Sequence, residues 1–193
     1  GIAEAESALR DLARHPATAR QIATKLARHF VADNPPPVLV DRLAQVFLAT
    51  DGDLRQMMRE IVHTPAVWAN PLSKVKTPNE FVVSVLRTTG FEGERKKLVG
   101  ALALLGQMPF SAPSPAGWPD EASKWVGAEA LLQRAEFAMT LSRKIGTRLD
   151  ARDLLDKSIA PVVSTETRLV IRRAPSRTEA LATLFASPEF QRR

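Results

Sequence analysis

The fold is decided by Lys76-Thr77-Pro78-Asn79-Glu80-Phe81-Val82-Val83-Ser84-Val85-Leu86. A threonine oxygen at a helix N-cap accepts a hydrogen bond from the third helical amide, and a glutamate at that third position reaches back to the amide of the cap. Proline suits the first helical position, because its missing amide hydrogen has no partner there. The stretch therefore predicts a helix that begins after Thr77. Its apolar side chains recur with the helical period, which predicts one buried face.

The same punctuation recurs along the chain, where capping side chains or prolines open apolar-periodic segments and glycines or prolines close them. These signals predict helices over residues 3–14, 16–31, 38–49, 53–62, 78–90, 94–105, 128–145, 151–157, 165–174 and 177–186. No segment alternates as a strand does. We therefore predict an all-α fold, an irregular compact bundle of about eight to ten helices in a single helical domain over residues 1–193.

Residues 107–120 contain prolines at positions 109, 113, 115 and 119, together with Phe110 and Trp118. This segment is too rich in proline for a helix and too apolar for a free linker. We expect a proline-rich extended strap, laid across the helices with its aromatic side chains buried. The helix over 128–145 has apolar residues on more than one side, which predicts a central position. The apolar residues expected to pack are Leu131, Leu132, Ala135, Phe137, Ala138, Met139 and Leu141.

Composition excludes several kinds of protein. The 193 residues include no cysteine and three histidines, which rules out disulfide scaffolds, thiol catalysis and cysteine-based metal sites. The histidines lack the spacing of a metal site, so we expect no metal and no cofactor. No apolar run approaches the roughly 20 residues that a transmembrane helix needs. The net charge is +6, but tyrosine is absent and the longest basic run is a triplet, so we expect a solvated basic face and no nucleic acid.

Two groups of residues are candidates for chemistry. Lys25 and His29 are four residues apart on one helix flank, a spacing that suits anion binding or an acid–base pair. The alternative is an ordinary solvated flank. Lys76, close to Lys74, lies at the electropositive start of a helix, where a second cation is unfavourable unless a carboxylate, phosphate or sulfate binds nearby. The alternative for Lys76 is ordinary pairing with Glu80 or simple exposure.

Several separate motifs in one order point to a known family. They are His15-Pro16-Ala17-Thr18-Ala19-Arg20, Lys25-Leu26-Ala27-Arg28-His29-Phe30, Lys76-Thr77-Pro78-Asn79-Glu80-Phe81-Val82, Leu105-Gly106-Gln107-Met108-Pro109, Ser114-Pro115-Ala116-Gly117-Trp118-Pro119 and Ser187-Pro188-Glu189-Phe190-Gln191. With them the chain resembles a bacterial family catalogued as a domain of unknown function, numbered eighteen hundred. Because the family's members carry a further N-terminal half, the chain resembles their C-terminal half. Many members carry export signals, so the resemblance implies a periplasmic or extracellular location.

The resemblance brings no reaction, cofactor or catalytic residue. It marks signature positions, and among these Lys25, His29 and Gln107 lack a purely structural explanation. With Lys76 they form the candidate ligand-binding set. Two functions remain open. One is a helical interaction or scaffold module that binds the N-terminal half of the same family chain or another exported protein. The other is half of a hydrolase-like enzyme, completed by that N-terminal half, which convergence of these polar side chains in one pocket would favour.

Overall fold

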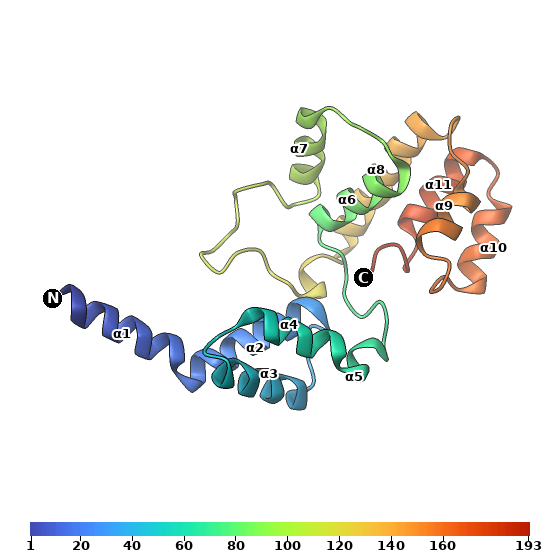
Figure 1. Ribbon diagram of the computed structural model, residues 1–193. Helices are drawn as coiled ribbons and strands as arrows, with labels where there is room; N and C mark the ends of the chain where they lie inside the picture. Colours follow the sequence, from blue (N-terminus) through green and yellow to red (C-terminus); the bar gives the residue numbers. More distant parts are fainter. The chain divides into compact units, whose positions relative to one another are not determined.

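The computed structural model describes residues 1–193 and is all-α, which confirms the predicted fold class. No strand is formed, and an isolated antiparallel bridge joins Val75 to Arg192. Figure 1 shows the elements in chain order. The helices are α1 (Ile2–Arg14), α2 (Pro16–Phe30), α3 (Pro37–Ala49), α4 (Leu54–His63), α5 (Pro65–Trp68), α6 (Pro78–Thr89), α7 (Arg95–Leu104), the 3-10 turn η1 (Ala122–Lys124), α8 (Ala128–Ile145), α9 (Ala151–Ser158), α10 (Thr165–Arg173) and α11 (Arg177–Ala186).

The helix starts follow the capping signals of the sequence. The Thr77 hydroxyl accepts from the amide of Glu80 (3.4 Å), and the Glu80 carboxylate accepts from the amide of Thr77 (2.8 Å). This reciprocal pair confirms the predicted capping box at the start of α6. Two short elements, α5 and η1, have no signal in the sequence, because a single turn of four or three residues has too short an apolar pattern to show a period.

The chain divides into two compact units, Gly1–Lys74 and Val75–Arg193, and each has its own hydrophobic core. We call them unit 1 and unit 2. A single helical domain over residues 1–193, expected from the sequence, stays a prediction.

Unit 1 is built on α2 and α3, which pack along each other, and α4 packs on α3. The buried side of α2 consists of Ala19, Ala23 and Ala27, one small side chain per turn. Small side chains at a helix contact allow a short distance between the axes. Leu43 of α3 and Met57 of α4 are completely buried in the same core.

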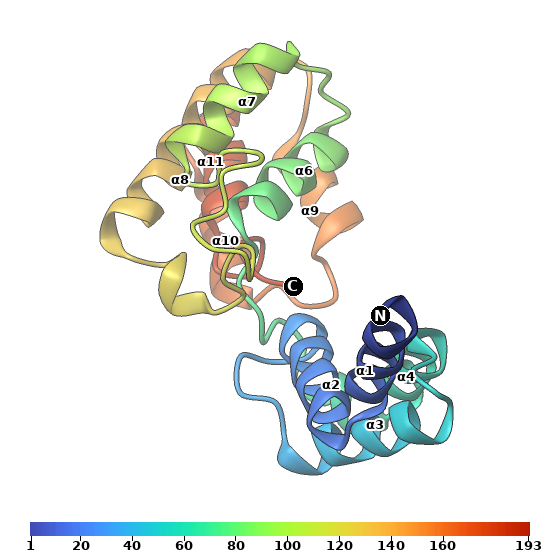
Figure 2. The same ribbon diagram turned by 90° about the vertical axis from the view of Figure 1, so that its left-hand side faces the viewer.

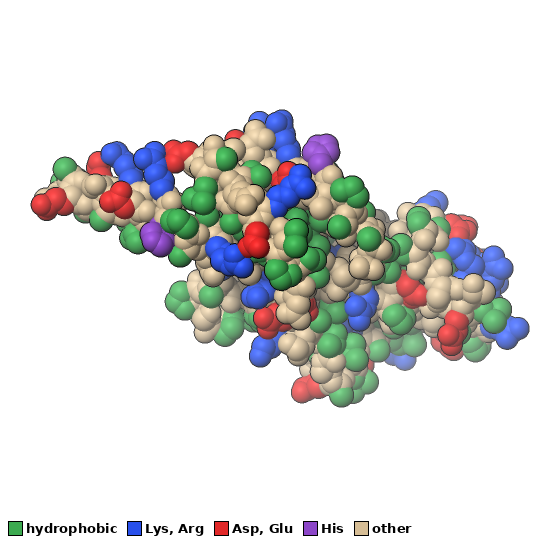
Figure 3. Space-filling model, turned by 90° about the horizontal axis from the view of Figure 1, so that it is seen from below, with side chains coloured by type: hydrophobic (Ala, Val, Ile, Leu, Met, Phe, Trp, Pro, Cys, Tyr) green, Lys and Arg blue, Asp and Glu red, His purple; other side chains and the backbone are tan.

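The first helix of unit 1, α1, contributes nothing to that core. It has no buried residue, and its apolar side chains Ile2, Leu9 and Leu12 are all exposed. Figure 1 shows α1 leading away from α2, α3 and α4, and Figure 3 shows hydrophobic, acidic and basic side chains together on its surface. Among its polar contacts, Arg14 forms an ion pair with Asp51 (2.8 Å) at the end of α3.

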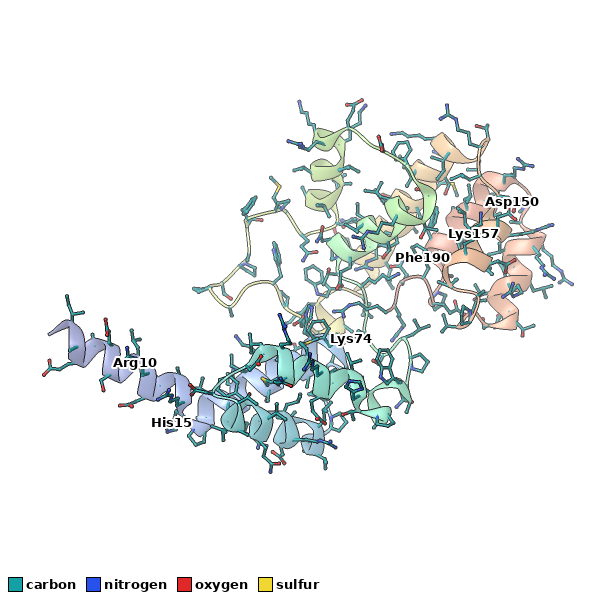
Figure 4. The ribbon with its side chains drawn as sticks, viewed as in Figure 1. Arg10, His15, Lys74, Asp150, Lys157 and Phe190 are labelled. Carbon is teal, nitrogen blue, oxygen red and sulfur yellow. The ribbon has the colours of Figure 1, made fainter.

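Unit 2 is centred on the packing of α8 against α11, with α6, α9 and α10 around them. Three phenylalanine rings lie edge to face in its core. The ring of Phe190 is 5.2 Å from that of Phe185 and 6.4 Å from that of Phe81. Phe190 therefore fixes the C-terminal tail against α6 and α11 (Figure 4).

Two predictions about unit 2 are wrong. In α8, Leu131, Leu132 and Ala135 are exposed, whereas the buried face contains Arg134, Ala138, Leu141, Ser142 and Ile145. In the strap, which Figure 2 shows as an irregular chain between α7 and η1, Phe110 is fully exposed.

The strap is held at its other end, where Trp118 is partly buried and its ring lies 6.0 Å from that of the buried Trp125. The Trp125 indole also donates to the carbonyl of Pro119 (2.9 Å). This aromatic pair anchors the C-terminal end of the strap, and Phe110 is left free of the core.

Candidate functional site

A basic cluster forms in unit 2 where the chain entering α6 meets the C-terminal tail, and its arginine from α8 is buried. The isolated bridge at Val75 and the hydrogen bond from the Lys76 amide to the Gln191 carbonyl (2.9 Å) hold these two segments together. Arg134 of α8 donates to the Gln191 side-chain oxygen and to the Lys76 carbonyl, both at 2.7 Å. The Gln191 amide donates to the Phe185 carbonyl (2.7 Å), which fixes the orientation of the Gln191 side chain. We call Lys76, Arg134, Arg192 and Arg193, with Glu80, the basic cluster.

Lys76 lies over an aromatic ring. Its ammonium is 4.4 Å from the centre of the Phe190 ring and donates to the Phe190 carbonyl (2.8 Å). Burial lowers the pKa of the Lys76 ammonium to about 8, a shift that Glu80 opposes and Arg134 increases. Cation–π contact and one carbonyl therefore only partly replace the water that this ammonium has lost.

Arg134 is 2% exposed, and its guanidinium carbon lies 5.4 Å from the centre of the Phe81 ring. Burial lowers the pKa of Arg134 to about 10, and Glu80 opposes this shift. Both of its hydrogen-bond acceptors are neutral. A buried guanidinium is normally matched by a carboxylate in direct contact, and here the structure provides none.

Glu80 is the one carboxylate that acts on the pKa of both Lys76 and Arg134. It is already engaged, because it accepts from the Thr77 amide and lies 2.9 Å from the Arg193 guanidinium. Lys76 and Arg134 therefore share the influence of a carboxylate that is bound elsewhere.

A cavity of about 420 Å3 opens beside this cluster. Its polar wall is formed by Arg134, Gln191 and Arg192. The rest of the wall is apolar, and it is formed by Val75, Val126, Leu131, Ala135, Ala186 and Pro188. Volume and lining are both typical of a small-molecule site, which is mostly apolar with a few polar groups.

A second and larger cavity, of about 1000 Å3, lies between α7 and α8. We call it the α7–α8 groove. Leu98 and Leu104 of α7 and Phe137 and Leu141 of α8 form part of its apolar wall. Glutamates and lysines also line it, among them Glu136 and Lys144 of α8 and the ion pair of Glu94, which precedes α7, with Lys97 (2.6 Å).

The predicted site residues fall in both units. Lys25 and His29 lie one turn apart on α2 of unit 1. Lys25 is exposed, and the partly buried His29 has its ring 4.7 Å from that of Phe30. Lys76 and Gln107 are both in unit 2 at the N-terminal end of α6, where the Asn79 amide donates to the Gln107 side-chain oxygen (2.8 Å). Convergence of all four residues stays a prediction. Gln107 now has a structural role, since it satisfies a free amide in the first turn of a helix.

Sequence reasoning missed Arg134, Gln191, Arg192 and Arg193. One signal was present for Arg134, because the face 134, 138, 141, 142 and 145 has helical spacing and contains three apolar residues. Because arginine is rarely buried, the sequence predicts that the buried face of this helix contains Leu131 and Leu132 and that Arg134 is exposed.

The structure thus defines an all-α protein of two compact units, the second of which carries a basic cavity. Comparison with protein families places it more narrowly. Residues 1–192 match the family described as "Protein of unknown function (DUF1800)", and the chain belongs to this family. Among curated proteins and solved structures, none matches. No helix is both long and apolar enough to cross a membrane, and no three His, Asp or Glu side chains are grouped so as to hold a metal ion.

Proposed function

We propose that this chain is a helical interaction module that receives an apolar helical segment of a partner protein in the α7–α8 groove. The observation that carries the proposal is the contrast between the size of this cavity and the burial of α7. The helix has no buried residue, although it carries Leu98, Leu102 and Leu104. Leu104, on the wall of the groove, is 74% exposed.

An apolar cavity of about 1000 Å3 has room for several side chains of an amphipathic helix. Helices bind such grooves through side chains at positions i, i+3, i+4 and i+7, which enter the apolar floor while the polar face stays in water. The mixed charges around the groove suit such a polar face.

The family resemblance supports a more specific proposal. In it, the chain is the C-terminal half of an exported bacterial protein, and the segment comes from the N-terminal half or from another exported protein. The hydrolase alternative requires four site residues that converge in one pocket. These residues are divided between the two units, and the alternative stays a prediction.

The test is site-specific photocrosslinking in cells that produce the full-length family protein. A benzoylphenylalanine replaces Leu104 in the groove, and in a matched control it replaces Lys96, an exposed residue of α7 that does not line the groove. We expect a discrete crosslinked peptide from position 104 only, and mass spectrometry then identifies its sequence. Equal crosslinking from both positions, or none from position 104, would contradict the proposal.

A second pair of variants tests whether the groove itself is used. Gly100 lines the groove, and a Cβ atom added there meets no atom within 4 Å. Gly100→Trp fills the groove and should abolish the crosslink. Gly100→Ala should retain it, because alanine leaves the groove open and favours the helix by about 0.5–1 kcal/mol.

A further inference from the structure

The basic cluster leaves a positive charge inside the protein without a direct counterion. Arg134 has five N–H donors, and its two hydrogen bonds go to the neutral oxygens of Gln191 and Lys76. Glu80 does not serve as its direct counterion, because it is already shared between the Thr77 amide and Arg193. An unpaired buried cation is costly, and an anionic ligand in contact with it would offset part of that cost.

The cavity beside Arg134 also leaves apolar surface uncovered. Leu131 is 47% exposed and Val126 is 38% exposed, although both line the cavity wall. Ala135, Ala186 and Pro188 extend this wall, so a ligand placed here meets apolar atoms on several sides. Covering such surface is favourable by roughly 25 cal/mol per Å2.

We propose that this cavity binds a small monocarboxylate with an apolar body, its carboxylate on the Arg134 guanidinium and its hydrocarbon part against Leu131 and Val126. Arginine presents paired N–H donors in a planar fork that matches a carboxylate. The cavity volume of about 420 Å3 suits a compact molecule of this kind. The site is separate from the α7–α8 groove and shares no lining residue with the protein-binding surface proposed there.

The experiment titrates the full chain with sodium octanoate by isothermal titration calorimetry. We expect saturable binding of one octanoate per chain. The neutral octan-1-ol should bind at least tenfold more weakly because it lacks the charge, and acetate at least tenfold more weakly because it lacks the apolar body. Comparable affinity for octanol or acetate would overturn the proposal, as would the absence of saturation by octanoate at 10 mM.

A pair of neighbouring variants locates the binding. Leu131→Glu places a carboxylate in the cavity wall, where it takes the position of the ligand beside Arg134. Leu132→Glu puts the same charge on the next residue, which is 60% exposed and does not line the cavity. Both positions are exposed, so neither variant should have a lower melting temperature than wild type. We expect octanoate binding to weaken at least tenfold in Leu131→Glu and to stay within twofold of wild type in Leu132→Glu. Equal loss, or loss in neither, would contradict the assignment.

Discussion

Lys76 and Arg134 carry charges that burial disfavours. The pKa values of about 8 and about 10 are both below those of the free side chains, which means that the folded state holds these protons less tightly than the unfolded chain does. Each side chain is nevertheless fixed by hydrogen bonds to neutral acceptors. The charges of Lys76 and Arg134 therefore lower the stability of the protein.

The stability of the protein should depend on pH through Lys76. Below pH 8 the lysine is protonated in both states, and its charge is disfavoured only in the folded one. Between pH 8 and 10.5 the unfolded state binds more protons, so the free energy of unfolding rises with pH. Lys76→Met removes this contribution. The stability of wild type relative to Lys76→Met should therefore rise by about 1–2 kcal/mol from pH 7 to pH 10, because one pKa unit is worth about 1.4 kcal/mol and partial exposure screens part of it.

Urea denaturation at several pH values measures this difference. The other lysines contribute equally to both proteins, so subtracting the two curves isolates Lys76. Two stability curves that run parallel from pH 7 to pH 10 would show that the ammonium is solvated.

At the scale of elements, the helix ends are set by local chemistry. Thr77 and Glu80 bond reciprocally at the start of α6, and Ser176 accepts from the amide of Glu179 (3.1 Å) at the start of α11. Each bond joins residues three apart in sequence, so its geometry needs no distant partner. This is why the helix starts were predictable.

Thr77→Ala should lower the free energy of unfolding by about 1 kcal/mol, because it leaves the amide of Glu80 without its acceptor. Thr88→Ala is the matched control, since Thr88 lies in the last turn of the same helix and is only partly buried. Thermal denaturation of the two variants should show a clear loss for Thr77→Ala and a change below about 0.5 kcal/mol for Thr88→Ala. Equal losses would show that the cap contributes nothing specific.

At the scale of the whole molecule, two hydrophobic cores are formed by separate parts of the chain. Leu43 is completely buried in the core of unit 1, and Leu184 is completely buried in the core of unit 2. A buried leucine replaced by alanine typically lowers stability by about 2–5 kcal/mol. The two positions therefore allow each core to be weakened by itself.

Hydrogen exchange should follow this division. In Leu43→Ala, amide protection should fall within residues 16–63 and stay unchanged within residues 78–190. In Leu184→Ala, the reverse should hold, because each substitution loosens only the core it belongs to. Exchange measured by mass spectrometry after the same labelling times compares the variants. Protection that falls equally in both units would instead support the single domain predicted from the sequence.

The helices of this protein and most of their ends can be predicted from the amino-acid sequence. Caps, prolines and apolar periodicity act within a few residues, so α8 was predicted at 128–145 and α11 at 177–186, the bounds the structure shows. Among the candidate site residues, Lys76 was found because its position before the Thr77 cap is also a local feature.

Which residues are buried, and which side chains are in contact, depends on how the helices pack in three dimensions. Burial depends on the helices packed against a face, so α8 buries Arg134 and exposes Leu131, although its own sequence favours the opposite. The acceptors of Arg134 come from residues 58 positions before it and 57 positions after it. No local pattern encodes contacts over such separations, because they exist only once the C-terminal tail has paired with the start of α6.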